Sequence, residues 1–288
     1  MTSLPQGRRF DWTNLGLRVA SALVLVPAVV AAIMIEASWP YLMLISIGVA
    51  LLGIEWGGMS APRSPLRVSA AVTAAVLAAL FLTHLQHPLW AWIAMVVGAA
   101  AAALVARGVA ERPTDAAFGV IYLAPAAICL AWLRLTNQGQ WWTLMLFLVT
   151  WSADIGAFAV GSALKGPKLW PRFSPNKTWS GFFGGLACAS LMGVLIAAPS
   201  ALDFHLPRAM MPAFSLNLWA AAVIGLAVGL ATMAGDLWES ALKRRFGVKD
   251  SGDLIPGHGG LLDRVDGLMF AVVVMALARL ANQWGWGH

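Results

Sequence analysis

Long apolar segments alternate with short polar ones along most of the chain. About nine of them are long enough to cross roughly 30 Å of hydrocarbon as a helix rising about 1.5 Å per residue. They lie near residues 16–35, 40–58, 67–86, 88–106, 116–134, 141–163, 181–202, 216–236 and 265–284. The pattern predicts an all-α, polytopic membrane protein with about nine transmembrane helices.

Composition supports the same class. Hydrophobic residues make up 60% of the chain and charged residues 11%, against about 45–50% and about 25% in globular proteins. A soluble domain of 288 residues could not bury that much apolar surface. The first apolar run exceeds the roughly 7–15 residues of a signal-peptide core, so we expect it to be retained as a span.

Positive charge is distributed unevenly between the predicted loops. With a cytoplasmic N-terminus, 16 of the 19 Lys and Arg residues fall on the cytoplasmic side, and Arg134, Arg208 and Arg279 fall on the other. This split agrees with the positive-inside rule and explains the net charge of +6 without a nucleic-acid partner. We expect one integral membrane domain over 1–288, with a helical scaffold at 1–140 and a catalytic half at 141–288.

One polar stretch, residues 236–266, concentrates the charge of this apolar chain. It holds six of the 13 acidic residues and five of the 19 basic ones. Helical spacing would place Asp236, Glu239, Ser240 and Lys243 on one face at the end of the eighth apolar segment. Such a face can be a solvated row of ion pairs, but here we expect chemistry.

Two aspartates at the start of the last apolar segment have two interpretations. Asp263 suits a helix N-cap, and Asp266 suits the positive end of the helix. Alternatively, both could join Asp236 as oxygen ligands of Mg²⁺, which commonly takes one or two carboxylates plus substrate phosphates. In the preceding glycine turn, 256–260, backbone N–H groups could bind an anion, and His258 is either a phosphate donor or a turn residue.

A second polar segment, residues 161–181, contains four cations, three prolines and no acid, so we expect an ordered loop there. Its cations could set the topology and contact anionic lipid headgroups. Alternatively, Ser174, Asn176, Lys177 and Thr178 could bind phosphate. Asp154, inside the preceding span, favours the second interpretation, because an acid within a membrane span is costly and usually marks a functional polar cavity.

Carboxylates, cations and a glycine turn at one membrane face are the components of metal-assisted phosphoryl or nucleotidyl transfer. The sequence contains no GxxxxGK[ST] loop, no HExxH motif and no zinc-type set of Cys and His. These absences exclude P-loop ATPases and metalloproteases.

The chain resembles the phosphatidate cytidylyltransferases (CDP-diacylglycerol synthases) in one long motif, SxLKRxxxxKDxGxxIPxHGGxxDRxD, over residues 240–266. Shorter stretches that suit the same family are Gly235-Asp236-Leu, Asp154-Ile-Gly-Ala and Ser174-Pro-x-Lys177-Thr-Trp. Together the motifs cover roughly residues 150–270, and so long a gapped motif is very specific. The chain departs from the family at Ser180, where members often carry Glu.

The resemblance implies transfer of the cytidylyl group of CTP to phosphatidic acid, giving CDP-diacylglycerol and pyrophosphate at the cytoplasmic face of a bacterial inner membrane. It implies Mg²⁺ held by Asp236 and Asp263, a homodimer, and a second, monovalent cation such as K⁺. We expect the catalytic set to be Asp236, Asp263, Lys243, Asp250 and Asp266. We expect the substrate-binding set to be Ser174, Asn176, Lys177, Thr178, Ser240, Arg244, Lys249, His258, Gly259, Gly260 and Arg264.

Two other classes of protein stay open. A secondary transporter would use Asp154 for ion coupling, but it should show paired repeats and broken midplane helices, which the sequence lacks. A lipid-binding structural protein would need the basic loops but not the aspartates. Release of pyrophosphate from CTP in the presence of phosphatidic acid would separate the enzyme from both.

Overall fold

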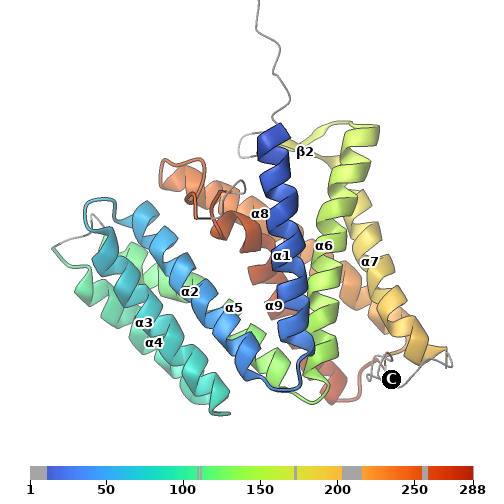
Figure 1. The fold of residues 1–288 in the computed structure, drawn as a ribbon, viewed down its shortest axis with the longest axis horizontal. Helices are drawn as coiled ribbons and strands as arrows, with labels where there is room; N and C mark the ends of the chain where they lie inside the picture. The colour runs from blue at the N-terminus through green and yellow to red at the C-terminus, as the bar shows by residue number, and fades with distance from the viewer. Residues whose placement is uncertain are drawn as a thin grey trace, which may run out of the picture.

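The computed structural model describes residues 12–108, 110, 112–171, 174–202, 216–254 and 259–287. Within these ranges the chain forms nine α-helices and one two-stranded sheet (Figure 1). The helices are α1 (Trp12–Met34), α2 (Trp39–Ser60), α3 (Pro65–His84), α4 (Pro88–Val105), α5 (Pro113–Leu135), α6 (Gly139–Leu164), α7 (Trp179–Ala201), α8 (Leu218–Arg245) and α9 (Leu262–Gln283). The strands β1 (Lys168–Trp170) and β2 (Ser174–Thr178) form an antiparallel hairpin between α6 and α7.

Helices α2 to α9 are each long and apolar enough to cross a membrane, and the most apolar stretch of each has a mean hydropathy of 1.7 to 2.0. Helix α1 has 23 residues, and its described apolar part is Leu23–Met34. These helices confirm the predicted all-α polytopic class. The side of the membrane that the N-terminus faces stays a prediction.

Helix α8 continues beyond the end of the eighth apolar segment, from residue 236 to Arg245. Its last turn carries Lys243, Arg244 and Arg245, whose positive charges suit the negative end of a helix. Lys243 also pairs with Glu239 one turn earlier. The polar face of 236–243 therefore lies on regular helix, as its spacing predicted.

The predicted loop at 161–181 is more regular than expected. Helix α6 extends to Leu164, and the hairpin follows with Lys168 opposite Thr178 and Trp170 opposite Ser174. Half of its strand residues are exposed, and of these strand residues only Thr178 is buried. The hairpin lies at the end of the bundle where α6 ends and α7 begins (Figure 1).

Helices α6, α7 and α8 pack closely because glycines line their contacts. A Cβ atom at Gly193 of α7 would lie 3.3 Å from the Cα of Gly225 of α8, and one at Gly225 would lie 2.5 Å from the carbonyl oxygen of Ala189. Small residues allow such close backbone approach between membrane helices. Helices α6 and α7 lie on one side of the bundle, α2 to α5 lie on the other, and α8 runs from the first side toward the second (Figure 1).

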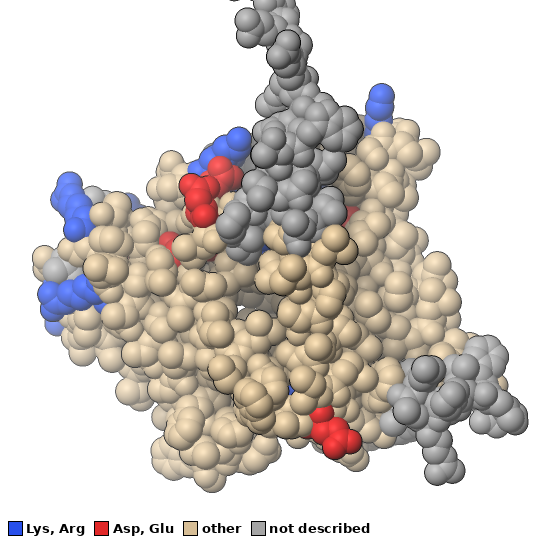
Figure 2. All heavy atoms as spheres, viewed as in Figure 1, with Lys and Arg blue, Asp and Glu red and all other residues tan. Residues whose placement is uncertain are grey.

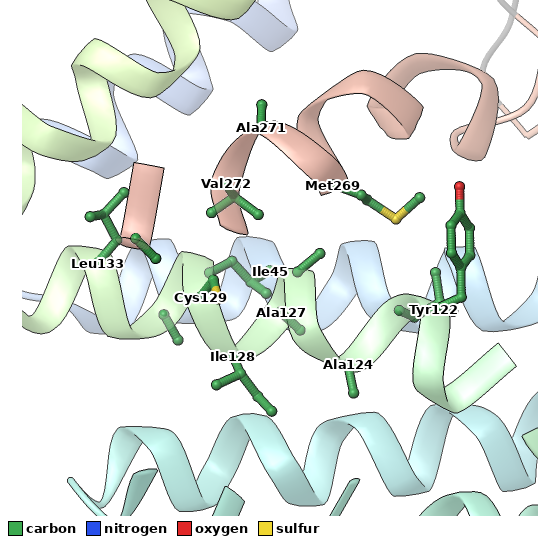
Figure 3. Packing of buried hydrophobic residues seen from close by; sticks show 14 of the residues in the cluster. Ile45, Tyr122, Ala124, Ala127, Ile128, Cys129, Leu133, Met269, Ala271 and Val272 are labelled. Atoms are coloured by element: carbon green, nitrogen blue, oxygen red, sulfur yellow. The ribbon is translucent and has the colours of Figure 1, made fainter. Parts of the chain in front are cut away.

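The buried core joins these two groups through α5 and α9. Figure 3 shows Cys129 of α5 near Ile45 of α2. It also shows Val272 and Met269 of α9 beside α5. All four side chains are buried. This packing fixes α9, whose first turns carry three of the predicted site residues, Asp263, Arg264 and Asp266.

Charged side chains gather toward one end of the bundle. In the face seen in Figure 2, most of the visible Lys and Arg lie toward the end with the hairpin, and the middle of the bundle is uncharged. The buried arginines Arg134 and Arg279 lie near the C-terminal ends of α5 and α9. The end of the bundle with the hairpin is therefore the place to look for a polar site.

Candidate active site

Thr232, Asp236 and Glu239 of α8 meet Asp266 of α9 where these two helices touch. A Cβ atom at Gly267 of α9 would lie 3.0 Å from the carbonyl oxygen of Thr232 and 3.2 Å from Oδ1 of Asp236 on α8. This close approach brings the carboxyl group of Asp266 within hydrogen-bonding reach of Asp236 and Glu239. Three carboxyl groups therefore share one small region, and repulsion between them favours a bound cation or proton.

A lysine from the hairpin reaches this carboxyl cluster. The Nζ atom of Lys177 on β2 lies 2.5 Å from Oδ2 of Asp236, and their side chains are 32% and 24% exposed. Asp154 of α6 lies close enough to both to interact with them electrostatically. Because this pair is partly open to solvent, a ligand phosphate could reach the ammonium group of Lys177.

A second lysine lies deeper in the site. Lys243 forms ion pairs with Glu239, at 2.8 Å, and with Asp263. The other oxygen of Asp263, Oδ2, accepts hydrogen bonds from the backbone N–H of Ser251 at 3.0 Å and from its hydroxyl at 2.9 Å. Both oxygens of Asp263 are thus engaged by protein donors.

The interpretation of Asp263 as a helix N-cap is wrong. The N-cap position of α9 is Leu261, which has no capping side chain. The backbone N–H groups of Leu261 and Leu262 instead donate to Glu55 of α2, at 2.6 and 2.7 Å. Because Glu55 takes the capping role, Asp263 is directed toward Lys243 and Ser251.

The other predicted residues take several positions at this end of the bundle. Thr178 is buried and caps α7, where its hydroxyl accepts a hydrogen bond from the N–H of Gly181 at 3.2 Å. The side chain of Arg244 donates to the carbonyl of Val248 at 3.3 Å. Gly259 has a φ of +82°, which glycine adopts readily. Half-buried positions are Ser174 and Ser240; exposed positions are Asn176, Arg244, Lys249, Asp250 and Arg264; Gly260 is buried; and His258 lies outside the described residues.

The donors suit a cation that takes most of its ligands from elsewhere. In the described ranges, no three side chains of His, Cys, Asp or Glu are arranged to hold a metal ion. Asp236 and Asp266 nevertheless lie within hydrogen-bonding reach of one another. Two carboxylates fit Mg²⁺, which usually keeps several waters and binds substrate phosphates.

The sequence interpretation missed three residues of this site. Glu55 and Ser251 bind one another at 3.0 Å and support Asp263. Tyr122 of α5 is 9% exposed, and its hydroxyl, which lies near Glu239 and Asp266, has no hydrogen-bond partner among the described residues. Glu55 had a detectable signal, because it is an acid inside an apolar segment, as Asp154 is.

Comparison with known proteins identifies the family of the chain. Residues 16–281 match the model of the Cytidylyltransferase family. The chain is 37% identical over 266 residues to the phosphatidate cytidylyltransferase of Brucella suis biovar 1, covering 92% of this chain and 93% of that protein. It is 39% identical over 162 residues to the phosphatidate cytidylyltransferase of Staphylococcus haemolyticus, covering 56% of this chain and 58% of that protein. A match of this extent confirms the resemblance found in the motifs: the chain belongs to the cytidylyltransferase family.

Proposed function

We propose that this protein transfers the cytidylyl group of CTP to phosphatidic acid, giving CDP-diacylglycerol and pyrophosphate. The relatives named as phosphatidate cytidylyltransferases support this proposal, since the alignment with the Brucella suis protein covers 92% of this chain. The apolar helices support a substrate that resides in a membrane. Both substrates carry phosphates, which the lysines of the site suit.

The observation that carries the proposal is the alternation of lysines and carboxylates at one end of an apolar bundle. Lys177 is paired with Asp236 and stays partly exposed, whereas Lys243 is paired with Glu239 and Asp263 and is more deeply placed. Before substrate binds, the carboxylates hold the two lysine side chains in place. Substrate phosphates can then compete with the carboxylates for the ammonium groups. A site of this kind suits a reaction in which two polyanions must meet.

The proposed reaction is a displacement at phosphorus. An oxygen of the phosphatidic acid phosphate attacks the α-phosphorus of CTP, the bond from that phosphorus to the α–β bridging oxygen breaks, and its electrons leave with pyrophosphate. The attacking phosphate is already ionised, so no strong general base is required. Lys177 and Lys243 would orient the phosphates and stabilise the charge that develops on the leaving group.

The residues that would hold Mg²⁺ are Asp236 with Asp263, as predicted, or Asp236 with Asp266, which lies within hydrogen-bonding reach of it. Bound there, the ion would supply charge neutralisation for the phosphates. The second cation, K⁺, and the homodimer implied by the family resemblance belong to the same proposal. So does a location in a bacterial inner membrane with the site facing the cytoplasm.

Purified protein in detergent tests the proposal directly. We expect pyrophosphate release and a lipid-extractable cytidylate product when CTP, phosphatidic acid and Mg²⁺ are all present. Reactions without lipid, or with ATP in place of CTP, serve as controls and should give little product. Monodisperse protein that forms no such product would refute the proposal and return attention to transport or lipid binding.

A further inference from the structure

Glu55, on α2, is a buried acid outside the residues assigned above to substrate or metal. Its side chain is only 3% exposed, and its carboxylate accepts three hydrogen bonds. Oε1 accepts from the N–H of Leu261 at 2.6 Å, and Oε2 accepts from the N–H of Leu262 at 2.7 Å and from the hydroxyl of Ser251 at 3.0 Å. A buried carboxylate with this number of donors is strongly held.

These bonds connect two parts of the chain, one at Ser251 and the other at Leu261 and Leu262. Ser251 precedes residues 256–260 in the chain, and Leu261 and Leu262 follow them, so one carboxylate binds the chain on both sides of this stretch. The backbone passes close to Glu55 at Gly252, where a Cβ atom would lie 3.2 Å from Cγ of Glu55. At Gly260 a Cβ atom would lie 2.8 Å from Oδ2 of Asp263.

Ser251 connects Glu55 to Asp263, one of the predicted catalytic residues. The hydroxyl of Ser251 lies 3.0 Å from Oε2 of Glu55 and 2.9 Å from Oδ2 of Asp263. One hydroxyl hydrogen serves two carboxylate oxygens, so the position of each carboxylate affects the other. Asp263 then pairs with Lys243.

The neighbour of Glu55 in α2, Trp56, anchors this part of the helix. The indole N–H of Trp56 donates to the carbonyl of Asp115 on α5 at 3.0 Å, and Trp56 is fully buried. Arg245, at the end of α8, pairs with the carboxylate of Asp115. Helix α2 is therefore tied to α5, and through α5 to α8, beside the acid that holds the start of α9.

We propose that Glu55 is a positioning residue for the transfer reaction, which holds Asp263 in place through Ser251 and the N-terminus of α9. This inference rests on the proposed function. It gives the N-terminal part of the chain an influence on the site, because the acid comes from α2 and all of its described partners come from residues 251–262.

Substitutions of Glu55 should change catalysis in a graded way. Glu55→Gln keeps the volume and one acceptor oxygen, whereas Glu55→Ala removes all three bonds. Because hydrogen bonds to a charged group are among the stronger ones, we expect kcat/KM to fall by roughly tenfold or more in Glu55→Ala and by less in Glu55→Gln. Glu36→Gln is the matched control, since Glu36 is exposed near the opposite end of α2 and its change removes the same charge.

A double-mutant cycle distinguishes positioning from simple helix stabilisation. If Glu55 acts through Ser251, the loss in kcat/KM of Glu55→Gln with Ser251→Ala will be smaller than the sum of the two single losses, in free-energy terms. A purely structural role predicts lower yield of folded protein, with unchanged KM for CTP and kcat in the folded fraction. That outcome, or additive effects, would overturn the inference.

A second readout does not depend on activity. A spin label at Leu254→Cys, in protein whose Cys129 and Cys188 are replaced by Ala, reports the mobility of the segment next to Ser251. We expect the label to become more mobile in Glu55→Gln and Glu55→Ala but not in Glu36→Gln, and equal mobility in all of them would refute the inference. If the parent protein forms no cytidylate lipid, the proposed function fails, and the label alone decides whether Glu55 holds this segment.

Discussion

The ammonium group of Lys177 and the carboxylate of Asp236 lie 2.5 Å apart, although their residues are 59 positions apart in the chain. The first belongs to the hairpin between α6 and α7, and the second to α8. This ion pair ties the basic hairpin to the carboxyl cluster. It places Lys177 of the hairpin in the candidate site.

Replacement of Lys177 by Ala should therefore impair substrate binding more than folding. A charge-assisted hydrogen bond contributes about 1.5–3 kcal/mol, so we expect kcat/KM for CTP or phosphatidic acid to fall roughly ten- to a hundredfold. Lys168→Ala is the matched control, because Lys168 is exposed on the other strand of the same hairpin. Parental kinetics with reduced membrane yield in Lys177→Ala would instead make Lys177 a determinant of topology.

Asp263→Asn should fold and insert normally while losing nearly all turnover. The amide keeps an oxygen that can accept from Ser251, but it removes the negative charge that faces Lys243. Steady-state turnover and gel-filtration behaviour should be compared with those of Asp253→Asn, because Asp253 is exposed in the same segment. Near-parental turnover of Asp263→Asn would show that this charge is not needed.

The metal requirement can be assigned to particular aspartates by Mg²⁺ titration. We expect chelation by EDTA to abolish turnover of the parent protein and added Mg²⁺ to restore it. Asp236→Asn should require more Mg²⁺ and be rescued only partly, since it loses a charge that would balance the ion.

The same titration decides which aspartate acts with Asp236. Of Asp263→Asn and Asp266→Asn, the variant that loses a ligand should shift the Mg²⁺ midpoint, and the other should lower turnover at an unchanged midpoint. A midpoint that stays parental in all three variants would argue against carboxylate ligands at this site.

Membrane topology can be tested by labelling single cysteines in intact cells, in protein lacking Cys129 and Cys188. We expect cysteines at Lys168 and Asp253 to be labelled only from the cytoplasm, because cations gather at their end of the bundle. Ser251 is unsuitable because it is 7% exposed and bonded to Glu55. A cysteine at the exposed Gln283, near the end of α9, should react from the periplasm, and the reverse pattern would invert the proposed orientation.

Close packing of α7 and α8 predicts a stability effect far from the site. A Cβ atom at Gly225 would lie 2.5 Å from the backbone carbonyl of Ala189, which has little freedom to move. We expect Gly225→Ala to destabilise the protein by about 1–3 kcal/mol and lower its thermal midpoint in detergent. Gly48→Ala, where nothing lies within 4 Å, is the control, and equal midpoints would contradict the prediction.

Local periodicity was enough to predict the helices and one face of the site. The apolar runs match spans because length and hydropathy are properties of each segment alone. The spacing of Asp236, Glu239 and Lys243 placed them on one helical face, and the ion pair between Glu239 and Lys243 lies on α8 as that spacing requires. The family motifs then named Asp236, Lys243, Asp263 and Asp266 for the candidate site.

Contacts between distant segments were not predictable in this way. Nothing in the segment around Asp263 reveals that Glu55 would cap α9 instead, since the two are joined only through tertiary packing. The hairpin was also missed, because strands of three and five residues are too short to show a repeating pattern. The cap by Glu55 depends on how α2 packs against the start of α9, which no local pattern encodes.

The bond between Glu55 and Leu261 has a consequence for the biogenesis of the protein. Its two partners are 206 residues apart. At a synthesis rate of about 5–20 residues per second, Leu261 is therefore synthesised tens of seconds after Glu55. During this time the ribosome has delivered α2 to the bilayer with a carboxyl group that lacks its final partners. We expect truncated chains that end before α9 to be substrates for membrane quality-control proteases, and Glu55→Leu to slow their degradation.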